Sequence, residues 1–219
     1  MSVALALPVP AAAADTGGLA APSPGAGAEA VDPEFRLSAR RAVFVKRAMR
    51  IKGAAPRAAG REVQVQWLDP AGTWQVATTV RADATGAFAT TWTPPHVGRF
   101  KLRAVLGPGA ASAQAQPARA SAPRTVTVYR PAKATWYGPG FYGNRTACGT
   151  RLTRRTIGVA HRRLRCGTPV SIRYRNRSLT VRVIDRGPFE RGVAWDLTEA
   201  AAKRLGMTTT SRIGAAPLR

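Results

Sequence analysis

The chain has 219 residues, with 34 Lys and Arg against 11 Asp and Glu and a formal net charge of +23. This length allows one large domain or two small ones, and the hydrophobic share of 45% is ordinary for a globular protein. No uninterrupted run of about 18 apolar residues occurs, so no transmembrane segment is expected. The charge indicates anionic surroundings: nucleic acid, anionic lipid, or the acidic polymers of a bacterial wall.

Residues 1–14 combine apolar side chains with a run of alanines that ends at Ala14. This pattern is typical of the end of a secretory signal, although the basic segment that normally precedes it is missing. Two interpretations stay open, a truncated signal peptide or a low-complexity Ala/Pro tail. Residues 15–33 carry almost no large apolar side chain and predict a flexible linker.

An exported protein would meet the cell envelope or cell wall, which makes wall polymers the expected anionic partners. The aromatic residues are not interleaved with the basic ones as a single-strand stacking platform requires, so nucleic acid is not an expected partner. The sequence leaves the oligomeric state open.

Short alternating segments fill residues 34–130. Val63, Val65 and Trp67 share one face of such a segment, which is the period of a half-buried strand. Turn-forming residues at 69–72 and 83–86 separate neighbouring segments. Strands are expected at residues 35–40, 42–53, 62–68, 73–81, 86–93, 98–106 and 124–129. This region predicts an immunoglobulin-like β-sandwich.

Residues 108–123, rich in Ala, Ser, Gln and Pro, are expected to form a long exposed loop before the last strand of this sandwich. The alternative is that they link the two domains. The second domain, residues 133–219, predicts strands at 134–137, 157–160, 169–174, 178–184 and 193–196. A short helix is expected at 198–205, with Thr198 as its cap and Gly206 as its stop.

The only cysteines are Cys148 and Cys166. In an exported chain such a pair predicts one disulfide, and the alternative is two buried free thiols. His96 and His161 are the only histidines, and no C-x-x-C spacing occurs, so neither a metal site nor a cofactor is expected.

Two aspartates stand near the ends of predicted strands. Asp185 follows an apolar run and precedes Arg186 and a Gly-Pro turn, whereas Asp196 follows Trp195 and precedes the helix. An apolar setting raises the pKa of a carboxyl group and a neighbouring arginine lowers it. Such a split suits glycan cleavage, which needs one protonated and one charged carboxyl group. The structural alternative is that Asp185 forms a salt bridge with Arg186 or caps a turn, and that Asp196 caps the helix.

Four aromatic residues, Trp136, Tyr137, Phe141 and Tyr142, surround a glycine-rich run at residues 138–143. They predict either an apolar platform for sugar rings or ordinary core packing. His161 would either hydrogen-bond an aspartate in the same groove or be a half-buried structural histidine.

Several ordered motifs make the segment 134–207 recognisable. They are the run from Thr135 to Gly143, Thr146-Ala147, Val159-Ala160-His161, Gly167-Thr168-Pro169-Val170, Val183-Ile184-Asp185-Arg186-Gly187-Pro188-Phe189, Asp196-Leu197 and Leu205-Gly206-Met207. In these motifs the segment resembles the rare lipoprotein A family. The resemblance implies a six-stranded double-psi β-barrel, similar to expansin and barwin barrels, with a groove for peptidoglycan strands. It also implies lytic transglycosylase activity that leaves a 1,6-anhydro end on N-acetylmuramic acid.

By this resemblance Asp196 is expected to act first as general acid and then as base, with Asp185 and His161 orienting groups and stabilising charge. Arg186 and Trp195 join the four aromatic residues as expected substrate-binding residues. The family commonly has a glutamate where this chain has Thr150, and a small polar residue at Cys148. The Cys148 and Cys166 pair is similar to disulfide-bearing expansin-like barrels, so a noncatalytic wall-binding or wall-loosening protein is the alternative.

Overall fold

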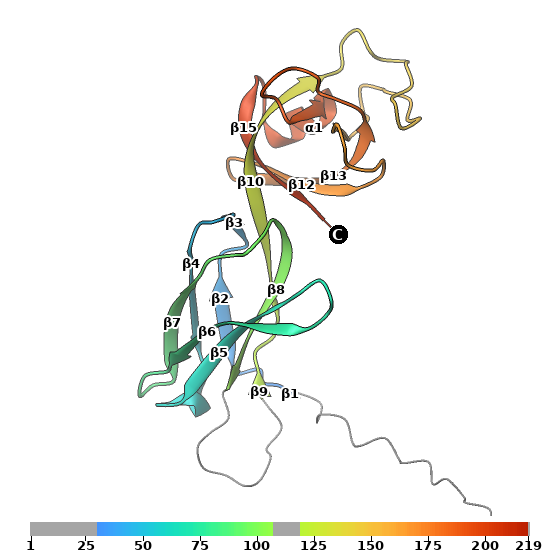
Figure 1. Ribbon diagram of the computed structural model, residues 1–219. Coiled ribbons are helices and arrows are strands. Elements are labelled where there is room, and N and C mark those ends of the chain that lie inside the picture. The colour runs from blue at the N-terminus through green and yellow to red at the C-terminus, as the bar shows by residue number, and fades with distance from the viewer. Residues whose placement is uncertain (1–29, 107–118, 219) are drawn as a thin grey trace, which may run out of the picture.

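The computed structural model describes residues 30–106 and 119–218, which form two β-rich parts, each with its own hydrophobic core (Figure 1). The expected signal peptide at 1–14 and most of the expected linker at 15–33 lie outside the described residues. Most of the expected loop at 108–123 lies outside them too.

Two sheets make up the N-terminal part. One contains β2 (Arg36–Ala39), β4 (Met49–Ala54) and β7 (Ala87–Trp92). The other contains β6 (Trp74–Arg81), β5 (Glu62–Leu68), β8 (Gly98–Leu106), β10 (Arg124–Tyr137) and β3 (Ala42–Phe44), and the short strands β9 (Arg119–Ala120) and β1 (Ala30–Val31) extend from β8. A 3-10 turn, η1 (Pro56–Ala58), joins β4 to β5. Ile51 from the first sheet and Leu102 from the second are buried in one core.

Both predicted turns are present. Gly72 N donates to Asp69 O at 3.1 Å and Gly86 N donates to Asp83 O at 3.0 Å. The single strand expected at residues 42–53 is wrong: β3 pairs with β10, β4 pairs with β2 and β7, and Lys46 between them has φ 63°. The chain crosses from one sheet to the other there, which an alternating apolar pattern does not reveal.

The C-terminal part is a closed barrel of six strands. Its further strands are β11 (Val159–Ala160), β12 (Pro169–Tyr174), β13 (Arg177–Asp185), β14 (Trp195–Thr198) and β15 (Ser211–Pro217). They pair in the order β10, β14, β11, β13, β12, β15, and β15 pairs with β10 to close the ring. The pairs β10 with β14 and β11 with β13 are parallel. The mainly β class and the barrel are therefore confirmed.

The predicted helix is α1 (Glu199–Leu205), and it begins and ends as expected. Thr198 caps its first turn by accepting the Ala201 N–H at 3.3 Å, and Gly206 ends it with φ 73°, where glycine avoids the strain of a side chain. Strand β15 was not predicted from the sequence. Its residues Gly214, Ala215 and Ala216 are small and buried, so they lack the alternation that indicates a strand.

Strand β10 belongs to both parts of the molecule (Figure 1). Its first half pairs with β8 and β3, and its second half pairs with β15 and β14. The predicted domain boundary, between residues 130 and 133, thus falls inside one strand. Close by, the Tyr129 hydroxyl and Ser171 Oγ are hydrogen-bonded at 2.9 Å across the junction. No helix in the described ranges has the length and apolar character needed to cross a bilayer.

Candidate active site

Four residues from neighbouring strands form one row across the barrel wall. Thr135 on β10 pairs with Asp196 on β14, and Ala160 on β11 pairs with both Asp196 and Asp185. Directly opposed residues point to the same face of a sheet. Asp196 and Asp185 therefore lie on one face, two strand spacings or about 10 Å apart at their Cα atoms. The small Ala160 side chain lies between them.

A β-bulge aims Asp185 into this row. Val159 of β11 pairs with Val183 of β13, but the next residue, Ala160, pairs with Asp185. Ile184 is therefore an extra residue in β13 without a partner on β11. Without the bulge Asp185 would share the inward face of Val183, which is completely buried. Gly158 accommodates the displaced side chain, because a Cβ on Gly158 would lie 2.4 Å from Ile184 Cδ1.

Backbone amides hold the Asp185 carboxylate. Its Oδ1 accepts the Arg186 N–H at 2.8 Å and the Ala147 N–H at 2.9 Å. The Arg186 guanidinium does not pair with this carboxylate. It donates instead to the carbonyl oxygens of Leu164 at 2.9 Å and His161 at 3.4 Å. The structural alternative of an Asp185–Arg186 ion pair is therefore excluded.

Asp196 differs from Asp185 in its electrostatic setting. Burial raises the pKa of Asp196, the hydrogen bond donated by Thr135 Oγ1 at 2.7 Å lowers it in part, and the charges of Asp185 and Glu190 raise it further. The net direction is upward. Asp196 does not cap the helix, since Thr198 does so. A carboxyl group in this setting holds its proton to a higher pH than an ordinary aspartate.

Tyr137 lies beside both carboxylates. Burial raises the pKa of its hydroxyl, and the charges of Asp185 and then Asp196 raise it further. This hydroxyl is the buried side-chain oxygen that has no partner at hydrogen-bonding geometry within the described part of the chain. The hydroxyl thus lies in contact with the Asp185 carboxylate, which also raises its pKa, but without a well-aligned hydrogen bond, and it stays a neutral O–H group beside the acidic pair.

These residues line one open cavity of about 470 Å³, which we call the acidic groove. Its floor contains Thr135, Ala160, Asp185 and Asp196. Aromatic side chains stand at its edges, with Phe141 56% exposed and Phe189 81% exposed. The remaining lining residues come mainly from the loops that follow β10 and β13: Trp136, Tyr137, Asn144, Arg145, Thr146, Leu152, Arg186, Gly187, Pro188 and Glu190. Large exposed apolar rings beside carboxylates are suited to contact with sugar rings.

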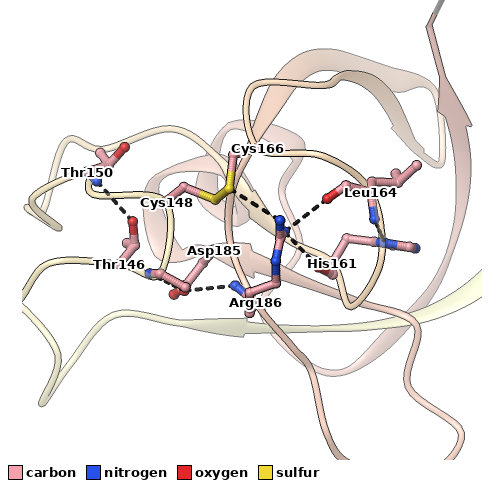
Figure 2. Close-up of a disulfide and its surroundings, with 9 residues drawn as sticks. Thr146, Cys148, Thr150, His161, Leu164, Cys166, Asp185 and Arg186 are labelled. Atoms are coloured by element: carbon pink, nitrogen blue, oxygen red, sulfur yellow. Dashed lines mark hydrogen bonds between the residues drawn. A yellow bond between two sulfur atoms is a disulfide. The ribbon is translucent and has the colours of Figure 1, made fainter.

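The predicted disulfide is confirmed: Cys148 and Cys166 are bonded, with Cα atoms 5.7 Å apart. Figure 2 shows that it links the loop containing Thr146 to the loop that follows His161, with Arg186 beside it. Cys148 N also donates to Ile184 O at 3.3 Å, next to the bulge. The disulfide thus fixes the loop whose Ala147 N–H holds Asp185.

His161 does not share the acidic groove. Its ring packs in a tilted arrangement against Trp195, with the ring centroids 4.3 Å apart, and both residues line a different cavity. Figure 2 shows His161 beyond Arg186, away from Asp185. The reason is the alternation of side chains along an extended chain. Ala160 and Asp196 face the acidic groove, whereas His161, directly after β11, and Trp195, before Asp196 on β14, do not. The structure therefore does not bring the His161 ring into the acidic groove, although the His161 backbone N–H donates to Asp185 O at 3.2 Å.

His161 instead organises a loop. Its Nδ1 accepts the N–H groups of Arg163 at 3.1 Å and Leu164 at 3.0 Å. Burial lowers the pKa of this imidazole, and the charges of Arg162, Arg186 and Arg163 lower it further. Both effects keep the ring neutral, as its acceptor role requires.

Two further expected substrate-binding residues lie away from the groove. Trp195 is 5% exposed and packs in the barrel core. The Tyr142 hydroxyl donates to Glu199 at the start of α1 and does not line the groove. Trp136, Tyr137 and Phe141 do line it, although the Trp136 indole N–H is bonded to Thr208 O at 3.1 Å.

Sequence reasoning missed Thr135, Phe189 and Glu190 as members of the groove. Thr135 could have been found from the pairing of β10 with β14, which no local pattern reveals. Phe189 and Glu190 stand directly after the Gly187-Pro188 turn, which could have indicated them. Among the described residues, no group of three or more His, Cys, Asp and Glu side chains is placed to hold a metal ion.

Residues 131–219 match the protein family described as lytic transglycolase. A probable endolytic peptidoglycan transglycosylase RlpA from Synechocystis is 40% identical over 117 residues, covering 49% of this chain and 36% of that protein. A second such protein, from Aquifex aeolicus, is 45% identical over 76 residues, 34% of each chain. The endolytic peptidoglycan transglycosylase RlpA of Campylobacter jejuni is 39% identical over 88 residues, 39% of this chain and 31% of that protein.

This chain thus spans about a third of the length of these relatives. The similarity coincides with the six-stranded barrel and with both groove aspartates. Over residues 131–219, the barrel of this chain is thus similar to the rare lipoprotein A (RlpA) family of double-psi β-barrels.

Proposed function

We propose that this protein is a secreted peptidoglycan lytic transglycosylase. It cleaves the β-1,4 bond between N-acetylmuramic acid and N-acetylglucosamine and leaves 1,6-anhydro ends. The observation that carries this proposal is the row of Asp196, Ala160 and Asp185 on the floor of one open groove. The names of the relatives from Synechocystis and Campylobacter jejuni support the same reaction.

Asp196 is the general acid in this mechanism, because its raised pKa keeps a proton available. The proton passes to the leaving oxygen, O4 of N-acetylglucosamine, as the bond from that oxygen to the anomeric carbon breaks. The 6-hydroxyl of the muramyl residue then bonds to the anomeric carbon and loses its proton to the Asp196 carboxylate. Asp196 is thereby regenerated, and no water is consumed.

Asp185 supplies negative charge to the same step. Two backbone N–H groups bind its carboxylate and fix its position in the groove. A fixed carboxylate beside the anomeric carbon stabilises the positive charge that develops there in an oxocarbenium-like transition state. Tyr137 donates its hydroxyl to substrate, and Phe141 and Phe189 contact the sugar faces at the groove edges.

The test is the release of anhydromuropeptides from purified wall, measured by mass spectrometry. We expect release by the wild type and a loss of about 100-fold or more for Asp196→Asn, because general acid catalysis contributes roughly 10²–10⁴-fold. The amide oxygen introduced by this substitution would still accept the Thr135 hydrogen bond, so binding to wall should persist in a pelleting assay.

Asp83→Asn is the matched control. Asp83 lies in a turn of the N-terminal part and accepts its hydrogen bonds through Oδ1, which asparagine retains. The Asp83→Asn variant should release as much anhydromuropeptide as the wild type. Equal release from Asp196→Asn would show that another group is the acid.

A noncatalytic, expansin-like wall protein is the second candidate. Thr150 at the position of the usual glutamate and the disulfide between Cys148 and Cys166 favour it. Thr150 is engaged in the loop itself, where its N–H donates to Thr146 Oγ1 at 3.1 Å. Wild-type protein that pellets with wall but releases no anhydromuropeptide would establish this candidate instead.

We also propose that residues 34–130 are an immunoglobulin-like sandwich and that the protein acts in the cell envelope or cell wall. The two sheets that share one core support the first proposal. The disulfide supports the second, because such bonds persist in oxidising compartments. Proteolysis at the β10 crossing should give no stable separate fragments, since one strand serves both parts.

A further inference from the structure

Two cavities flank β10 where it passes from the sandwich to the barrel. One has a volume of about 1130 Å³ and the other about 590 Å³. They share Arg99 and Thr125, so they are neighbours, and we call the pair the junction groove. Both are lined from the two parts of the molecule: the first by Lys101 and Trp195, for example, and the second by Arg99 and Arg173.

The junction groove is strongly cationic. Its only carboxylate among the described lining residues is Asp69. That side chain already accepts bonds from Thr73 N at 2.8 Å and Gln75 Nε2 at 2.9 Å. Five positively charged side chains of the lining have no carboxylate partner in the described part of the chain: Arg41, Arg99, Lys101, Arg130 and Arg173.

Two other basic residues of the groove are engaged. Lys133 Nζ lies 3.8 Å from Glu190 Oε1, and Arg124 Nε donates to Leu37 O at 3.0 Å. The five remaining cations are therefore an unneutralised set. Like charges held together at a concave junction repel one another, and an anionic ligand relieves that repulsion. The charge favours a polyanion over a neutral glycan.

Hydroxyl groups stand beside these cations. Thr125, Thr127, Ser178 and Thr180 line the smaller cavity together with Arg99 and Arg173. Arginine offers planar, forked N–H donors that match the oxygens of a phosphate, and hydroxyl groups add further donors. The chemistry of the lining thus fits a chain of phosphodiesters.

The shape of the groove limits the class of polyanion. A flat bilayer cannot follow a concave junction between two parts of a molecule. Single-stranded nucleic acid needs exposed aromatic faces for base stacking. The aromatic residues of the larger cavity offer no such faces: Trp195 is 5% exposed and packs against His161, with ring centroids 4.3 Å apart, and Phe100 is 2% exposed. A slender, flexible chain without bases fits best.

We propose that the junction groove binds a phosphodiester-linked polyol or sugar polymer of the cell wall. The choice of a wall polymer rests on the proposed wall function, whereas the anionic preference rests on the groove alone. Binding there would hold the protein on the wall while the acidic groove, which shares no lining residue with the junction groove, stays open for glycan.

The test measures affinity for purified poly(glycerol phosphate) by calorimetry at low and moderate salt. The junction variant carries Arg99→Gln, Lys101→Gln, Arg130→Gln and Arg173→Gln. The control variant carries Lys52→Gln, Arg81→Gln, Arg155→Gln and Arg204→Gln, four residues that are exposed and line neither cavity. The two variants have the same net charge.

We expect the junction variant to bind at least about fourfold more weakly, since each of the four exposed ion pairs contributes a factor of roughly 1.4 to 5. The control variant should bind within about twofold of the wild type, and salt should weaken wild-type binding. Equal affinities of the two variants would overturn the proposal. So would tighter wild-type binding to duplex DNA, single-stranded DNA or anionic phospholipid vesicles than to poly(glycerol phosphate).

Anhydromuropeptide release from polymer-free glycan strands separates this proposal from the preceding one. The junction variant should release product at the wild-type rate. If the wild type releases no product, the proposed reaction is wrong. If, in the same experiments, the junction variant loses polymer binding and the control variant does not, polymer binding at the junction groove is still supported.

Discussion

The acidic groove and the junction groove border the same two strands but differ in charge: three carboxyl groups and two arginines line the first, whereas one carboxylate and seven Lys or Arg side chains line the second. Ala160 of β11 and Asp196 of β14 line the acidic groove, whereas the adjoining His161 and Trp195 line the junction groove. The first collects Asp185, Glu190 and Asp196 in a chain of net charge +23. The second collects cations. Strand alternation therefore allows one barrel wall to serve an acid-dependent reaction on one side and polyanion binding on the other.

Filling the space between the two aspartates should produce the largest loss of activity while leaving the junction groove intact. Ala160→Leu places a branched side chain on the floor of the acidic groove, and we expect anhydromuropeptide release to fall by about 100-fold or more because substrate is displaced. Overpacking should cost about 1–3 kcal/mol of stability, measured by thermal unfolding. Binding of poly(glycerol phosphate) should not change. If a folded Ala160→Leu variant releases product at the wild-type rate, the row of Asp196, Ala160 and Asp185 is not the floor of the catalytic site.

Breaking the disulfide tests how Asp185 is held. The double variant Cys148→Ser, Cys166→Ser should lose about 3 kcal/mol of unfolding free energy, since the closed loop has a sequence separation of 18. The loop that carries the Ala147 N–H is then less ordered, and release should fall by about tenfold. Reductant should lower the stability and the release of the wild type and should leave both properties of the double variant unchanged. A reductant effect of equal size on both would mean that the disulfide is not responsible.

His161 should act through the loop it organises. His161→Leu removes the acceptor of two backbone N–H groups, and the adjoining Leu164 carbonyl binds Arg186. We expect release to fall by roughly fivefold to tenfold, because a displaced Arg186 disturbs Asp185. His161→Asn, which offers an acceptor oxygen, should recover most of the activity with the pH profile of the wild type. No recovery, together with a changed pH profile, would indicate that the imidazole itself transfers a proton.

The smallest effect concerns pH and stability. The pKa of Asp196 is raised on folding, so its contribution to stability is fully present below the unfolded pKa and is lost as pH rises through the folded pKa. Asp196→Asn should therefore be more stable than the wild type at neutral pH. Solvent screens this partly exposed group, so the gain should be small, roughly 0.5 kcal/mol by chemical denaturation. A less stable variant at neutral pH would contradict the buried, acid-favouring setting.

Local sequence patterns identified most of the strands, the helix and both groove aspartates. Asp185 and Asp196 stand at strand ends beside a turn and a helix cap, and such positions are legible from spacing. Thr198 and Gly206 likewise mark the helix by their local chemistry. These features depend only on residues close together in the chain.

The local sequence does not reveal features for which pairing between distant residues decides the direction of a side chain. The bulge at Ile184 turns Asp185 outward, and the pairing of β11 with β14 sets His161 and Trp195 on another side from Asp196. Tyr142 was expected in the groove, but its hydroxyl is bound to Glu199, 57 residues away. None of these partners can be read from the local sequence.

The central claim is that Asp196 keeps its proton because it is buried and Asp185 stands charged in the same row. Titration of the Asp196 side-chain carboxyl carbon by NMR, in the wild type and in Asp185→Asn, measures this directly. We predict that Asp196 titrates above the ordinary aspartate range in the wild type and moves toward that range in Asp185→Asn. Titration at or below the ordinary range, or the same value in both proteins, would contradict the account.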